Sequence, residues 1–144
     1  MIMDAMQISR SGLDVEWQRL QIIAQNLANV DTSKTVTGTS YRALRLVSGP
    51  AENFADVVAR KGVPVRPTGV KVLGIEAQPG GVRRVYDPND PQADAKGFVS
   101  YPAIDHAGEM TLLIRTSRAY EANLTAMSIA HQMYARALDF GKQA

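Results

Sequence analysis

The loop at residues 86–97, YDPNDPQADAKG, is acid-rich and could bind a metal ion. Carboxylate and amide oxygens spaced along a short loop are the ligands that Ca²⁺ takes in an EF-hand. If such a motif began at Asp87, Asn89 would fit its third position. However, Gln92 would replace the glycine required at the sixth position, and Phe98 the glutamate required at the twelfth. The calcium motif fails, and aspartate followed twice by proline instead predicts a structured loop with Asx-type turns.

The other reactive residue types do not converge on a site. The two histidines, His106 and His131, are 25 residues apart, with no accompanying metal-ligand spacing. The sequence contains no cysteine, no nucleophile elbow and no glycine-rich phosphate-binding loop. The sequon at residues 123–125 lies on a predicted helix, so we interpret it as chance. We therefore predict no enzymatic activity, no cofactor and no metal.

Composition favours an ordinary folded protein. The chain has 144 residues, of which 45% are hydrophobic and 21% charged, values typical of a globular domain. A net charge of +2 without a dense basic stripe argues against nucleic-acid binding. No apolar run approaches the roughly 18 residues of a membrane span, and the N-terminus lacks the pattern of a cleaved secretory signal. We expect neither direct membrane insertion nor export with signal cleavage.

Proline and glycine divide the chain into three parts. All seven prolines lie between residues 50 and 102, together with most of the glycines. The predicted fold class is α+β, with long N- and C-terminal coiled-coil helices flanking a small, irregular, mainly β middle region. We assign residues 1–32 and 104–144 to the helical coiled-coil domain and residues 33–103 to the middle region.

Each terminal part carries an apolar heptad pattern typical of a coiled-coil helix. One helix is predicted from Asp4 to about Asn29, and the other over about 106–140 with Asp105 as its N-cap. Eleven residues of these patterns are candidates for an assembly interface: Leu13, Trp17, Leu20, Ala24, Leu27, Leu113, Tyr120, Leu124, Met127, Tyr134 and Leu138.

The last helix is apolar around most of its circumference, beyond what one partner helix can cover. Since the middle region offers no matching long helix, the surplus face points to contacts with other chains. The alternative is a four-helix-like core in one chain, completed by helices of the middle region that the pattern conceals.

The middle region reads as β-strands and loops. Residues 40–47 and 69–78 have the alternation of half-buried strands. The turn QPGG then leads to residues 82–86, which we interpret as the return strand of a hairpin. Residues 52–60 fit a strand or a short helix equally well.

The stretch QNLANVDT at residues 25–32 ends the first helix. Asparagine, aspartate and threonine bond nearby backbone groups, so Asn26, Asn29, Asp31 and Thr32 predict a helix cap that runs into a turn.

Three separated motifs give the chain a family resemblance. Residues 26–32 match the Asn-Leu-Ala-Asn-x-x-Thr element of the rod proteins of the bacterial flagellar basal body. The loop at 86–99 and the helical stretch from Ser117 to Asn123 resemble the proximal-rod proteins of the C type within that family. One departure is that residues 33–40 stand before Tyr41, where many relatives have Pro-Gly-Tyr directly after the threonine.

The resemblance implies a structural subunit that polymerises through its terminal helices into the rod crossing the periplasm, the axial drive shaft for motility. Its partners would be copies of itself, other rod proteins, the export apparatus and the inner-membrane ring, with no small-molecule substrate. It would be exported by the flagellar type III apparatus without signal cleavage. Residues 25–32 would be the hinge between the inner tube of helices and the outer β region. A coiled-coil adaptor or scaffold that forms a closed oligomer is the alternative of a different class.

Overall fold

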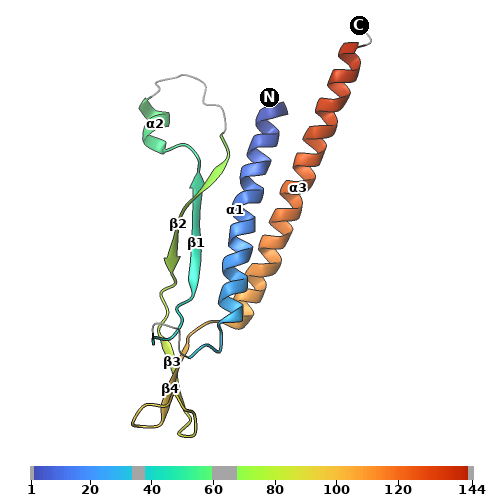
Figure 1. Ribbon diagram of the computed structural model, residues 1–144. Helices are drawn as coiled ribbons and strands as arrows, with labels where there is room; N and C mark the ends of the chain where they lie inside the picture. The colour runs from blue at the N-terminus through green and yellow to red at the C-terminus, as the bar shows by residue number, and fades with distance from the viewer. Residues whose placement is uncertain (1, 34–37, 60–67, 143–144) are drawn as a thin grey trace.

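The computed structural model describes residues 2–33, 38–59 and 68–142. Two long helices, α1 (Ile2–Ala28) and α3 (His106–Lys142), pack side by side, and four short strands lie between them in the sequence. In Figure 1 the β1–β2 hairpin runs along α1 on the side away from α3, and the β3–β4 hairpin projects beyond the lower end of the helix pair. The predicted α+β fold, with terminal helices flanking a β middle region, is confirmed.

The two helices are antiparallel. Asn26 of α1 contacts Glu109 of α3 at one end, and Gly12 contacts Asn123 further along. The α3 helix begins directly after Asp105, as predicted for its N-cap. The α1 helix begins at Ile2, so the predicted start at Asp4 is two residues too late.

The β1–β2 hairpin is fixed to α1 by a small apolar core. Strands β1 (Leu44–Pro50) and β2 (Val70–Ala77) pair antiparallel, with a register shift at Val47/Ser48. Leu46 packs against Val15 and Ile22 of α1, and all three side chains are buried. The strand was predicted at residues 40–47, and the observed strand begins four residues further along the chain, at Leu44. Residues 34–37 of the preceding connection lie outside the described part of the chain.

The predicted return strand exists, but its predicted partner is wrong. Strand β3 (Val82–Tyr86) pairs with β4 (Phe98–Pro102), not with β2. The N–H of Gln78 bonds the carbonyl of Ala43, while the N–H of Ala103 bonds the carbonyl of Gly81. The two sides of the QPGG turn thus belong to different ladders, and the turn links two hairpins instead of closing one.

The acid-rich loop connects β3 to β4 and has the predicted Asx turns. The Asp87 and Asp90 carboxylates accept the N–H groups of Asn89 and Gln92 at 3.2 and 2.7 Å. Asp94 adds a third such turn, and the N–H groups of Phe98 and Lys96 lower the pKa of its carboxyl. The aspartate carboxylates therefore accept hydrogen bonds from backbone N–H groups of the loop.

The undecided segment of the middle region is helical. Helix α2 spans Phe54–Ala59, and it is the only helix between α1 and α3 among the described residues. With six residues it is too short to complete a four-helix core. No helix in the described ranges is both long and apolar enough to cross a membrane.

Candidate functional site

Small and polar residues make a large part of the contact between α1 and α3. Gly12 brings the helices close together, because a Cβ atom added there would lie 2.7 Å from Oδ1 of Asn123. Along α3 the buried positions recur every seventh residue, as expected of one helix face. The buried residues along this contact are Ser9, Gly12, Ile23 and Asn26 on α1 and Glu109, Thr116 and Ala130 on α3.

The large apolar residues of the two helices face outward. Trp17 is 54% exposed and Leu124 is 51% exposed. A single exposed apolar side chain is ordinary on a protein surface, whereas many of them together indicate an interaction surface. Other exposed apolar residues of the helices are Met3, Met110, Leu112, Ile114, Ile129, Met133, Tyr134, Leu138 and Phe140. The helix pair thus buries few of its large apolar side chains within the chain: Val15, Ile22 and Ile23 of α1 are buried, whereas the residues named above are exposed.

None of the eleven candidate assembly residues is fully buried. On α1 they are displaced by one position from the buried column. Trp17 and Tyr120 come together across the two helices, with ring centroids 6.3 Å apart. Leu13, Leu20, Leu27, Leu113, Tyr120 and Met127 are partly buried, and Trp17, Ala24, Leu124, Tyr134 and Leu138 are exposed.

Asn26 is the centre of the junction between the helices and the β region. Its side chain is 1% exposed and makes four hydrogen bonds. Nδ2 donates to the Leu44 carbonyl at 2.8 Å and to Oε2 of Glu109 at 3.2 Å. Oδ1 accepts from the Leu44 N–H and from the Tyr41 hydroxyl, both at 2.9 Å. One amide therefore joins α1, β1 and α3, which is more than the helix cap predicted for it.

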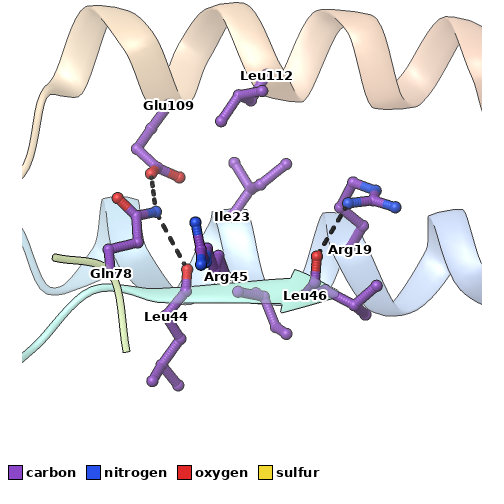
Figure 2. A pocket seen from close by; sticks show the side chains of 9 residues that line it. Arg19, Ile23, Leu44, Arg45, Leu46, Gln78, Glu109 and Leu112 are labelled. Atoms are coloured by element: carbon purple, nitrogen blue, oxygen red, sulfur yellow. Dashed lines mark hydrogen bonds between the residues drawn. The ribbon is translucent and has the colours of Figure 1, made fainter. Parts of the chain in front are cut away.

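Glu109 and Gln78 complete this junction, as Figure 2 shows. Nε2 of Gln78 donates to Oε1 of Glu109 at 2.9 Å and to the Leu44 carbonyl at 3.3 Å. Glu109 is 4% exposed and receives hydrogen bonds from two neutral amides. The desolvation cost of this carboxylate is offset only while both donors stay in place. The junction therefore holds α3 and the β region in one fixed arrangement.

The Tyr41 hydroxyl lies within the junction, and its environment raises its pKa. Burial, and secondarily the negative charge of Glu109, raise the pKa of its hydroxyl above the ordinary 10.0. Below pH 10 both the folded and unfolded chains keep this proton. As the pH rises further, the unfolded chain loses it first, so the free energy of unfolding falls until the folded pKa is passed.

We expect Tyr41→Phe to lose about 1 kcal/mol of unfolding free energy at neutral pH, because the hydrogen bond to Asn26 is missing. The variant should also lose less stability than the wild type as the pH rises above 10.0, since it has no hydroxyl at this position. Urea unfolding across this pH range measures both effects. The gap in stability between the two proteins should narrow with pH, whereas parallel curves would contradict the junction as described.

The remaining motif residues cap the helix and its turn. Nδ2 of Asn29 donates to the Gln25 carbonyl at 2.8 Å, and the Thr32 hydroxyl donates to Oδ1 of Asn29 at 3.1 Å. Asp31 is exposed in the turn. Nδ2 of Asn123 donates to the Ala119 carbonyl at 3.0 Å, at the close contact with Gly12. The sequence correctly predicted the cap at Asn29 and Thr32.

Two further residues of α1, neither of them part of a recognisable motif, hold the β1–β2 hairpin. The Arg19 guanidinium donates to the Leu46 carbonyl at 3.2 Å and to Ser48 Oγ at 2.9 Å. The Ser11 hydroxyl accepts the Val70 N–H at 3.1 Å. With Asn26, these contacts recur about every seven residues along one face of α1. The hairpin is therefore attached to α1 along most of the helix.

Comparison with known proteins places the chain in a family. Residues 95–140 match the family model "Flagellar basal body rod FlgEFG protein C-terminal". The flagellar basal-body rod protein FlgC of Bacillus subtilis is 36% identical over 96% of this chain and 97% of its own length. The proteins of the same name from Aquifex aeolicus and Escherichia coli O157:H7 are 34% and 33% identical, each over 98% of both chains. The chain belongs to the FlgC family of flagellar basal-body rod proteins.

Membership of the FlgC family confirms the resemblance drawn from the three motifs. The family consists of structural proteins of the flagellar basal-body rod, which supports a structural function in the rod and not the alternative of a closed adaptor. Within the part of the chain that the structure describes, no group of three or more His, Asp or Glu side chains is placed to hold a metal ion. The structural features of this FlgC-family chain that bear on its function are the exposed faces of the two helices and the junction at Asn26.

Proposed function

We propose that the chain polymerises through the exposed faces of its two terminal helices into the rod, the axial drive shaft for motility. The observation that carries this proposal is the set of large apolar side chains that the two helices leave exposed. The α1–α3 contact is close at Gly12 and polar at Asn26, while Trp17, Leu124 and nine other large apolar residues of the helices remain exposed. Burial of one such side chain contributes about 1.5–3 kcal/mol. Contacts with neighbouring subunits would bury many of them together.

The total surface supports the same proposal. The chain exposes 10260 Å², whereas a compact monomer of 15.6 kDa is expected to expose about 7,200 Å². The surplus of about 3,000 Å² is in the range that obligate protein interfaces cover. An elongated helix pair with a hairpin alongside it gives this surplus (Figure 1).

In the proposed assembly, the helices form the inner tube and the β region lies outside it. The junction at Asn26 and Glu109 sets the angle between the two layers. The partners are copies of the chain, the other rod proteins, the export apparatus and the inner-membrane ring. The chain reaches the periplasm by type III export without signal cleavage and does not insert into the membrane. It has no catalytic activity, no small-molecule substrate and no nucleic-acid partner.

Electron microscopy of the purified protein at rising concentration, alone and mixed with other rod subunits, tests this proposal. Heterologous contacts propagate, so the particles should grow in length with concentration. Particles that saturate at one fixed size would contradict it, because a closed interface leaves no surface for the next subunit.

A further inference from the structure

The C-terminal end of α3 extends past the start of α1. The contacts Asn26–Glu109 and Gly12–Asn123 are separated by fourteen residues on each helix, so the register is constant. In this register Ile2 lies level with Met133. Residues 134–142, which we call the overhang, extend past the described part of α1, and Figure 1 shows α3 continuing beyond α1 toward the C-terminus.

The overhang has the pattern of a helix contact. The contact column of α3, buried at Thr116 and Ala130 and partly buried at Asn123, continues at the exposed Ala137, and the flanking column continues at Tyr134. Tyr134 is 37% exposed, and Phe140 is 75% exposed. The α1–α3 contact surface thus continues beyond the end of α1, and a second helix is needed to cover it.

A groove of suitable chemistry lies at the opposite end of the helix pair. It has a volume of about 280 Å³ and is lined by Glu16, Arg19, Leu112, Arg115, Thr116 and Ala119. A cavity of about 150 Å³ accepts a benzene ring, so this groove has room for an aromatic side chain. The arginine side chains can stack on an aromatic ring, and Leu112 and Ala119 can contact aliphatic groups.

The overhang cannot reach the groove of its own chain. Ala119 and Leu138 lie on one continuous helix, about 30 Å apart along its axis. A second copy that is displaced along the helix axis by about this distance would bring its overhang level with the groove. In a polymer of equally oriented subunits, the overhang of one copy meets the opposite end of the next.

We propose that the overhang of each subunit lies in the groove between α1 and α3 of the next copy, with Tyr134 and Phe140 against Arg19 and Arg115. This inference rests on the proposed function and adds to it the two surfaces that meet. In this arrangement, the face of α3 that contacts α1 within one subunit continues into the overhang and contacts the helices of the next subunit.

Cross-linking of the full chain tests this contact, because the sequence contains no cysteine. In Leu138→Cys/Ala119→Cys, a short bifunctional maleimide should join subunits into a ladder of covalent multimers once the protein has assembled. The matched control is Leu138→Cys/Thr125→Cys, since Thr125 lies on a different face of α3. We expect at least tenfold more multimer in the first variant. Equal yields, in polymers that microscopy shows to have formed, would overturn the contact while leaving the proposed function intact.

Removing the rings gives an independent readout. Tyr134→Ser/Phe140→Ser should raise the concentration needed for assembly at least tenfold without changing the unfolding midpoint of the monomer, because both rings are exposed in one chain. Ala135→Ser, in the same segment, is the control and should assemble as the wild type does. Unchanged assembly of the double variant would overturn the inference. Failure of the wild type to assemble under any condition would instead overturn the proposed function.

Discussion

The Asn26→Asp variant is expected to lose at least about 3 kcal/mol of unfolding free energy, the largest stability effect that the junction predicts. Aspartate has the size of asparagine and retains an oxygen that can accept hydrogen bonds from the Leu44 N–H and the Tyr41 hydroxyl. It loses the Nδ2 donor and places a second carboxylate beside Glu109, at a position where the native side chain is 1% exposed. Since folded domains are stable by only about 5–15 kcal/mol, urea unfolding should show a large shift of the midpoint.

A second substitution at the same contact provides the control. In Asn26→Asp/Glu109→Gln, the glutamine amide can donate to the new carboxylate, which reverses the direction of the native hydrogen bond. The double variant should therefore be more stable than Asn26→Asp alone by about 1–2 kcal/mol. If the losses of unfolding free energy caused by the two substitutions are additive, Asn26 and Glu109 do not interact in the way described.

The Leu124→Asp variant is expected to abolish assembly while leaving the isolated subunit folded. Leu124 is 51% exposed in the single chain, so the charge there should change its stability by no more than about 0.5 kcal/mol. Between subunits the same carboxylate would be buried without a partner, at a cost of several kcal/mol. Thermal unfolding of the monomer and sedimentation of the polymer measure the two effects separately.

The neighbouring residue supplies a matched variant. Thr125 is also exposed on α3, so Thr125→Asp adds the same charge one position away without placing it on the predicted apolar column. It should assemble normally. If both variants assemble, the apolar column is not an interface. If Leu124→Asp unfolds the monomer, Leu124 belongs to the core of the single chain.

The helices were predictable because their apolar periodicity is long, with only a few polar residues such as Arg10 in it. The periodicity did not predict which face of each helix packs within the chain. On α1 the apolar column through Leu13, Trp17 and Leu20 is the obvious contact, but the chain buries the column one position earlier, with Ser9 and Gly12. Small residues allow close approach of the helices, and periodicity of hydrophobic residues does not detect them. A polymerising chain uses its strongest apolar face elsewhere, so this signal identifies surfaces that only an assembly would bury.

The strand pairing and the junction depend on contacts distant in sequence. Residues 82–86 were identified as a strand, yet their partner lies after the acidic loop and not before the QPGG turn. Asn26 was identified from its motif, but Gln78 and Glu109 are single polar residues without a local pattern. Only the fold brings them together.

The central claim is that the exposed helix faces become buried between subunits, and Trp17 tests it most directly. It is the only tryptophan in the sequence and is 54% exposed in the single chain. Quenching of its fluorescence by acrylamide should be efficient in dilute monomer and should fall severalfold in the assembled polymer, with a blue shift of the emission. Equal quenching in the monomer and the polymer would contradict the claim, because the helix faces would then remain in contact with water after assembly.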